Sequence, residues 1–414
     1  DHLFLLDGSG FIFRAYHALP KLTRKKDGLP VGAVTGFCNM LWKLLREARA
    51  TNLGASPTHF AVIFDHSSDT FRKKIYPLYK ANRQEAPEDL KPQFSLIRKA
   101  CAAFNIICIE KPNFEADDLI ATYTRLALEQ EAKVTIISSD KDLMQLVTED
   151  VCLFDPIKEN MICRQEVIEK WGVPPELMPS LQALTGDSSD NIPGVPGIGK
   201  KTAAELLQIY ENLDNLLAQL NKIKQPKRRE SLISHKEQIY LALELVKLKN
   251  NVNIDISLDD LILQEQDAPK IIGFLKALEL KSLANRISQH SLAEIENIEP
   301  SFIEVEWKNP SDAVEETEPP LTKGGEGGGA ALFYQSLQKT FFESPLLAEQ
   351  YLFIKDIEEL KNWLNYAQEQ YFCSVETEFL DNKLSAISLS LSGEKTAFAC
   401  FSHQEHQQDE NLSE

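Results

Sequence analysis

Long apolar runs are missing from this sequence of 414 residues, which has no stretch of about 18 apolar residues and no signal-peptide pattern at its start. We therefore expect neither membrane insertion nor export. Paired cysteines are missing as well, because no two of the seven have the spacing of a metal or redox site. We expect all seven to be reduced residues of a cytoplasmic protein: Cys38, Cys101, Cys108, Cys152, Cys163, Cys373 and Cys400.

Basic residues are too few to balance the acids, since 44 Lys and Arg face 62 Asp and Glu and leave a net charge of −18. The shortage is local. Residues 291–414 contain 24 acids and 7 bases, whereas residues 1–290 contain 38 acids and 37 bases. The first 290 residues are therefore nearly neutral and have basic side chains available for a polyanion such as nucleic acid.

Carboxylates are concentrated between Asn113 and Asp142, in two groups separated by one helix and one strand. An apolar-periodic run predicts a helix over 115–130, with acids in its first turn, where the helix dipole stabilises negative charge. A buried strand is predicted over 133–138, and the second group follows it. The acids are Glu115, Asp117 and Asp118 before that strand, and Asp140 and Asp142 after it.

Three other segments carry acids in the same kind of position. Asp7 and Asp65 each end a short apolar run, and Asp187 and Asp190 lie in a turn. At the carboxyl edge of a parallel sheet these acids would face one crevice, where like charges raise each other's pKa unless cations neutralise them. Hard oxygen ligands without His or Cys favour Mg²⁺ or Mn²⁺ over Zn²⁺. The alternative is that each acid is only a helix cap or a solvated charge, but five segments repeat the pattern.

Alternating helices and strands predict an α/β fold with a doubly wound, mainly parallel central sheet. At this length two or three domains are expected. Helices are predicted at about 32–49, 89–104, 115–130 and 141–148, and strands at 105–110, 133–138 and 151–155.

Bases and aromatics alternate between Phe71 and Arg83, directly after a strand that ends in a candidate metal ligand. Basic side chains neutralise phosphates and tyrosines stack on unpaired bases, so this mixture suits a single strand in a groove. A solvated charged face is the alternative. Earlier, glycines after Asp7 allow a tight turn from which Arg14 reaches towards bound phosphate.

A glycine-rich turn over 194–203 opens a helix, and its backbone N–H groups and lysines suit DNA phosphates without reading bases. Farther on, a basic run over 222–229 either contacts a duplex or is a solvated face.

These motifs together resemble the flap endonuclease family, in the form of the 5′ nuclease domain found in bacterial DNA polymerase I. The matching segments are Leu6-Asp7-Gly8, Phe64-Asp65, Glu115-Ala116-Asp117-Asp118, Ser139-Asp140-Lys141-Asp142, Gly186 to Asn191, and a helix-hairpin-helix from Gly194 to Ala203. They follow the family's order over residues 1 to about 290. The resemblance therefore implies a PIN-like nuclease fold with a helix-hairpin-helix subdomain.

The resemblance also implies roles for single residues. A first metal would be held by Asp7, Asp65, Glu115 and Asp117; a second would be bound or supported by Asp118, Asp140, Asp142, Asp187 and Asp190. The family's helical arch, which admits a free 5′ strand, is matched by Tyr79, Lys80 and Arg83. Of these, Lys80 and Arg83 are expected to contribute to catalysis. The hairpin matches a duplex clamp that holds K⁺. The expected DNA-binding residues are Arg14, Arg72, Tyr79, Lys80, Arg83, Gly194, Gly197, Ile198, Gly199, Lys200 and Lys201.

The C-terminal third changes character. Residues 291–331 predict a flexible acidic linker, and Phe372 to Asn382 resembles the first motif of the 3′–5′ proofreading exonuclease that follows the 5′ nuclease in the same proteins. Glu376 matches that motif, but Ser374 stands where the family has a metal-binding Asp. We expect 332–414 to be a partial, inactive domain with an RNase H-like fold. The absent initiator Met and the end at Glu414, before any polymerase domain, suggest a fragment.

The sequence therefore predicts domains at 1–185 (catalytic, with an arch at about 66–90), 186–290, 291–331 and 332–414. The predicted enzyme is a monomeric, nucleoid-associated 5′–3′ exonuclease and flap endonuclease with two Mg²⁺ or Mn²⁺ ions about 4 Å apart. Its expected substrates are flapped or nicked duplex DNA and RNA primers on DNA, with no membrane partner. The alternatives are an enzyme that acts chiefly as an exonuclease at nicks, and a non-catalytic DNA-binding module.

Overall fold

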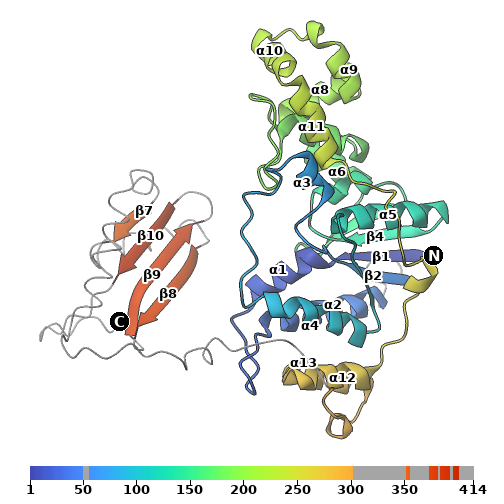
Figure 1. Cartoon of the computed structure of the whole chain (residues 1–414), viewed down its shortest axis with the longest axis vertical. Coiled ribbons are helices and arrows are strands. Elements are labelled where there is room, and N and C mark those ends of the chain that lie inside the picture. Colours follow the sequence, from blue (N-terminus) through green and yellow to red (C-terminus); the bar gives the residue numbers. More distant parts are fainter. Residues whose placement is uncertain (50–55, 302–350, 355–372, 381–382, 392–394, 401–414) are drawn as a thin grey trace, which may run out of the picture. The chain divides into compact units, whose positions relative to one another are not determined.

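The computed structural model describes residues 1–49, 56–301, 351–354, 373–380, 383–391 and 395–400, and Figure 1 shows its elements. The chain divides into two compact units, Asp1–Glu315 and Glu316–Glu414, and each is described by itself. No helix in these residues is both long and apolar enough to cross a bilayer.

The first unit is built on a six-stranded sheet with the strand order β3-β2-β1-β4-β5-β6. The first five strands of this order run parallel, and β6 pairs antiparallel with β5. The predicted mainly parallel α/β sheet is therefore confirmed. The strands are β1 His2–Asp7, β2 His59–Ile63, β3 Ile107–Ile109, β4 Lys133–Ile137, β5 Val151–Asp155 and β6 Asn160–Ile162.

Apolar side chains of the central strand are buried on both faces, as a parallel sheet requires. Leu3 and Leu5 of β1 pack in one core cluster, and Phe4 and Leu6 pack in the other. Helix α5 (Ala116–Glu129) covers the first face. The second face is covered by α1 (Gly8–Ala18), α2 (Gly32–Arg49) and α4 (Lys91–Ala103) (Figure 1).

A helical part follows the sheet and lies beyond α5 in Figure 1. After it the chain returns to the sheet body, because α12 and α13 contribute Ile271, Phe274 and Ile287 to the same core cluster as α2 and α4. The predicted subdomain 186–290 therefore contains two helices that pack on the catalytic part. The helices are α6 Arg164–Trp171, α7 Met178–Thr185, α8 Lys200–Tyr210, α9 Leu213–Ala218, α10 Pro226–Ser234, α11 Lys236–Val246, α12 Ala268–Ala277 and α13 Lys281–Ser291.

Short elements account for most of the remaining differences from the sequence predictions. The helix expected at 141–148 is a 3₁₀ helix, and the arch segment forms only the five-residue helix α3 (Phe71–Ile75), followed by turns. The 3₁₀ helices are η1 Asp142–Leu146, η2 Pro175–Leu177, η3 Leu220–Lys222, η4 Asp259–Leu261 and η5 Ile295–Asn297.

One cysteine prediction is wrong. Cys152 and Cys163 form a disulfide, because the antiparallel pairing of Leu153 with Ile162 sets these cysteines opposite each other at the open end of a hairpin. Their separation of 11 residues gave no sign of it in the sequence. Cys38, Cys101 and Cys108 are free.

The second unit contains a four-stranded sheet with the order β7-β10-β9-β8, in which only β10 and β7 pair parallel. Ser374 and Glu376, the two positions of the exonuclease-like motif, both lie on β8. Most of the predicted linker 291–331 falls outside the described residues. The strands are β7 Tyr351–Ile354, β8 Cys373–Leu380, β9 Lys383–Leu391 and β10 Lys395–Cys400.

Candidate metal and nucleic-acid site

Three neighbouring parallel strands deliver acids to one edge of the sheet. Asp7 ends β1, Asp65 follows β2, and Asp140 follows β4 after Ser138. Asp65 also accepts a hydrogen bond from the backbone N–H of Ala116, at 2.8 Å, which ties the end of β2 to the start of α5. The predicted convergence of strand-end acids is therefore what parallel pairing produces.

Asp7 is buried at this edge. It accepts hydrogen bonds from the Gly10 backbone N–H at 3.0 Å and from the Ser138 hydroxyl at 2.9 Å. Burial raises the pKa of Asp7 to about 6, the Asp65 and Asp140 charges add to the rise, and the two hydrogen bonds oppose it. No cation within the described residues forms an ion pair with this carboxylate.

Asp117 and Asp142 are half-buried, and their pKa values shift in the same direction as that of Asp7. Burial, followed by the charges of Asp140 and Asp7, raises the pKa of Asp117 well above its usual value. Burial and the charge of Asp140 raise the pKa of Asp142 to about 7, although the amide of Gln182 donates a hydrogen bond to it at 2.5 Å. Asp7, Asp117, Asp140 and Asp142 are here called the unpaired group, because among the described residues no base forms an ion pair with any of them; the nearby charge of Lys80 only partly offsets the repulsion at Asp117.

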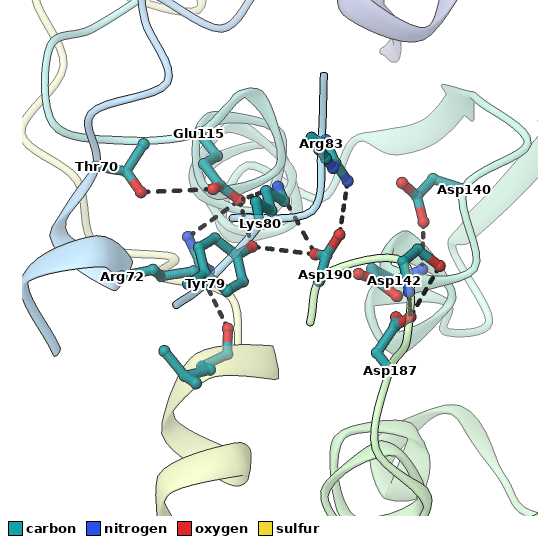
Figure 2. Close-up of polar contacts among 12 residues, drawn as sticks. Thr70, Arg72, Tyr79, Lys80, Arg83, Glu115, Asp140, Asp142, Asp187 and Asp190 are labelled. Carbon is teal, nitrogen blue, oxygen red and sulfur yellow. Dashed lines mark hydrogen bonds and ion pairs between the residues drawn. The ribbon is translucent and has the colours of Figure 1, made fainter. Parts of the chain in front are cut away.

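Glu115 and Asp190 form a second, cation-paired group on the other side of the site (Figure 2). Lys80 Nζ lies 3.0 Å from Glu115 Oε2 and 3.7 Å from Asp190 Oδ2, and Arg83 Nη2 lies 2.6 Å from Asp190 Oδ1. Tyr79 donates its hydroxyl to both carboxylates at 3.1 Å. Burial lowers the pKa of Lys80, but attraction to Glu115 and Asp190 outweighs this effect and raises the pKa overall.

Asp187 has its own partners. Lys141 Nζ lies 2.8 Å from one oxygen, and the Ser189 backbone and hydroxyl donate to the other at 2.9 Å. Burial raises the pKa of Asp187, but these hydrogen bonds outweigh it and lower the pKa below its usual value. Gly186 precedes it at φ +72°, and its Cα closely approaches the Gly194 backbone, so a side chain there would clash.

Asp118 departs from its expected place at the second metal. It is fully buried, and its two oxygens accept hydrogen bonds from Arg72 at 2.7 and 2.8 Å and from the backbone N–H of Lys249 at 2.8 Å. Asp117 and Asp118 are consecutive on a helix and so point about 100° apart, which sends only one of them to the strand edge. Asp118 therefore joins α3 and α5 to the chain after α11.

Whether the acids suit a metal can be judged from their surroundings. Among the described residues, no three His, Cys, Asp or Glu side chains stand close enough together to hold an ion as they are. The unpaired group nevertheless fits a divalent cation, since carboxylates with pKa values raised by burial and mutual repulsion need positive charge, and all the donors are hard oxygens. Glu115 and Asp190 already have protein cations.

The expected DNA-binding residues fall into two sets. Arg72 and Tyr79 are only 1% and 3% exposed, so the ion pair with Asp118 and the hydrogen bonds to Glu115 and Asp190 replace the predicted phosphate and base contacts. Arg14 is half-buried, and Lys80 and Arg83 lie between the acids and the solvent.

The hairpin presents a mixed face. Ile198 is buried and anchors the turn, whereas Gly197, at φ +79°, and Gly199 have open space around them. Gly194 lies against Gly186. Lys200 is held over the Trp171 ring at 3.9 Å and donates to a backbone carbonyl, while Lys201 is exposed.

Sequence reasoning missed the supporting polar residues. Ser138 and Gln182 hydrogen-bond to Asp7 and Asp142, and Thr70 lies 3.5 Å from Glu115. A serine directly after a buried strand signals such a role weakly. Gln182 lies within a helix 40 residues from its partner, and no local pattern marks it.

Comparisons with known proteins agree with the geometry. Residues 2–172 match the family model of the 5′-3′ exonuclease N-terminal resolvase-like domain, and residues 173–269 match that of the 5′-3′ exonuclease C-terminal SAM fold. The chain is 38% identical to the 5′-3′ exonuclease of Aquifex aeolicus, covering 69% of this chain and 95% of that protein. It is 48% identical to DNA polymerase I of Rhizobium leguminosarum over 96% of this chain, but spans only 41% of that protein's length.

The solved structures show the same fold at lower sequence similarity. One of the bacteriophage T5 5′-exonuclease with bound divalent zinc ions has a TM-score of 0.51 and 23% identity, covering 72% of this chain and 99% of that chain.

Proposed function

The chain belongs to the 5′-3′ exonuclease family, and from that premise we propose that it is a metal-dependent, structure-specific 5′ nuclease that removes 5′ flaps and primers from duplex DNA. The unpaired group carries this proposal. Simple binding to a polyanion gains nothing from clustered carboxylates whose charges raise the pKa values of Asp7, Asp117 and Asp142, whereas a divalent-cation site requires such a cluster.

Some residues of the chain would hold the metal ions, and others would orient those ligands. Asp7, Asp65, Asp117, Asp140 and Asp142 would hold two Mg²⁺ or Mn²⁺ ions, joined by Glu115, Asp187 and Asp190 once these acids leave their protein cations. When bound, such ions supply an activated water and stabilise the charge on the attacking and leaving oxygens. Ser138 and Gln182 fix the orientation of Asp7 and Asp142.

Substrate would be held without base readout. The open turn at Gly197 and Gly199 leaves backbone N–H groups accessible to duplex phosphates, with a K⁺ ion and Lys201 adding positive charge. Lys80 and Arg83 would contact the 5′ strand beside the acids. We further propose a monomer that acts in the bacterial cytoplasm at the nucleoid, in keeping with its proposed DNA substrate.

The test uses a 5′-end-labelled flap duplex, a nicked duplex and an RNA primer on DNA, each incubated with Mg²⁺ or EDTA, with products resolved by length. We expect Mg²⁺-dependent release of a fragment cut near the flap junction, leaving a 5′-phosphate and a 3′-hydroxyl. Binding without a product in Mg²⁺ and in Mn²⁺ would favour the non-catalytic DNA-binding module instead.

A further inference from the structure

In the cation-paired group, both oxygens of Asp190 already have protein partners. Arg83 occupies Oδ1 at 2.6 Å, and Tyr79 at 3.1 Å and Lys80 at 3.7 Å face Oδ2. At Glu115, Oε2 receives Lys80 at 3.0 Å and Tyr79 at 3.1 Å, with Arg72 at 3.5 Å. Among the described residues no cation pairs with Glu115 Oε1, which lies 3.5 Å from the Thr70 hydroxyl, so a divalent cation that binds either carboxylate competes with Lys80 or Arg83 for its charge.

The backbone around these side chains is held separately. The Lys80 N–H donates to the Asp190 carbonyl at 2.9 Å, and Asn82 and Asn191 each donate a side-chain amide across the contact, at 2.8 and 2.7 Å. Residues 78–83 therefore stay beside residues 188–191 whether or not the charged side chains are paired. Release of Lys80 or Arg83 needs a side-chain rotation only, and the Arg83 side chain is already 55% exposed.

We propose that Lys80 and Arg83 are resident counter-ions of Glu115 and Asp190, which a divalent cation displaces, freeing both bases to bind phosphates of the 5′ strand. Buried carboxylates need a partner charge, and Mg²⁺ replaces the one that the lysine and arginine provide. Phosphate oxygens then replace the carboxylates around the released bases. By linkage, metal and strand each raise the affinity for the other by the same factor.

This inference rests on the proposed function, because it concerns the same metal site. It predicts opposite effects of one substitution. Lys80→Ala removes a competitor of the metal and a partner of the strand, so it should raise affinity for Mg²⁺ and lower affinity for DNA. A residue with a merely structural role would change both affinities in the same direction.

Isothermal titration of Mg²⁺ into the DNA-free protein provides the first readout. Lys80→Ala and Arg83→Ala should each bind Mg²⁺ about tenfold more tightly than the wild type, the size expected for removing one charge near a partly buried site. Lys21→Ala is the matched control, since Lys21 is 84% exposed and its ion-pair partner, Asp89 at 3.6 Å, belongs to neither group of acids, so it should leave Mg²⁺ affinity unchanged.

Fluorescence anisotropy of a phosphorothioate-protected single strand provides the second readout. Mg²⁺ should tighten strand binding to the wild type, and this gain should shrink in Lys80→Ala and Arg83→Ala. If the wild type binds Mg²⁺ and both variants bind it equally or more weakly, the counter-ion inference is wrong and the nuclease proposal stands. If the wild type binds no divalent cation, the nuclease proposal fails, and the inference with it.

Discussion

At the scale of single residues, neighbours in the sequence have different tasks. Asp117 belongs to the unpaired group at the strand edge, whereas Asp118 is sealed against Arg72. The motif alone placed both at the metals, because sequence spacing does not report which side of a helix faces the sheet edge. Arg72 lies 46 residues before Asp118, so their pairing depends on tertiary contacts that no local pattern encodes.

Loss of the Asp118 carboxylate should lower the free energy of unfolding, because this side chain pairs with a buried arginine. Asp118→Ala leaves the Arg72 guanidinium buried without its carboxylate, which costs about 3–5 kcal/mol in free energy of unfolding. Urea unfolding measures this change. The control is Glu129→Ala, which removes an exposed partner of Arg125 and should cost about 0.3–0.5 kcal/mol. Equal, small losses in both variants would refute the structural role of the buried pair.

At the scale of elements, the carboxyl ends of β1, β2 and β4 determine the site. The alternation of apolar strands and amphipathic helices predicted this edge, and parallel pairing brings Asp7, Asp65 and Asp140 to it. The sequence did not predict that residues 76–83 turn inward and place Tyr79 among the acids. Composition marks a basic aromatic segment as a DNA surface, but burial of the tyrosine depends on how 188–191 folds against it.

The raised pKa values make the stability of the metal-free protein depend on pH. Asp7 and Asp142 bind protons more strongly when folded, with pKa values of about 6 and about 7 against 3.8 for an ordinary Asp side chain. Between pH 4 and 7 the folded state therefore holds more protons than the unfolded state, and stability falls as pH rises. One pKa unit corresponds to about 1.4 kcal/mol, so the loss should be measurable by urea unfolding in EDTA.

Two further measurements test whether the raised pKa values cause this loss of stability. Asp142→Asn should be less sensitive to pH than the wild type, because one titrating carboxyl is gone. Mg²⁺ should restore stability at pH 8 far more than at pH 5, where protonated carboxyls bind it poorly. A metal-free wild-type protein that gains stability between pH 5 and 8, with the variant unchanged, would show that the acids do not repel one another as inferred.

At the scale of the whole molecule, the nuclease body does not end with the hairpin subdomain. Ile271, Phe274 and Ile287 of α12 and α13 complete the core beneath α2 and α4, although the matched family models end at residue 269. The sequence placed these helices with the hairpin because they follow it. Only their burial against α4 reveals that the chain has returned to the sheet.

Truncations test this boundary. A chain of residues 1–301 should retain the urea midpoint and flap cleavage of the first unit, since the second forms its own contacts. A chain of residues 1–267 should be much less stable, because it exposes the apolar faces of α2 and α4 at about 25 cal/mol per Å². Equal stability of the two chains would show that α12 and α13 are dispensable.

The central claim is that acids of the unpaired group perform Mg²⁺-dependent cleavage of a 5′ flap. The most direct test is the single-turnover rate of flap cleavage by the wild type, Asp117→Asn and the exposed control Glu129→Gln, together with their affinity for the duplex. Asp117→Asn should cleave at least about a hundredfold more slowly while binding duplex normally, and Glu129→Gln should match the wild type. Full activity in Asp117→Asn would contradict the claim.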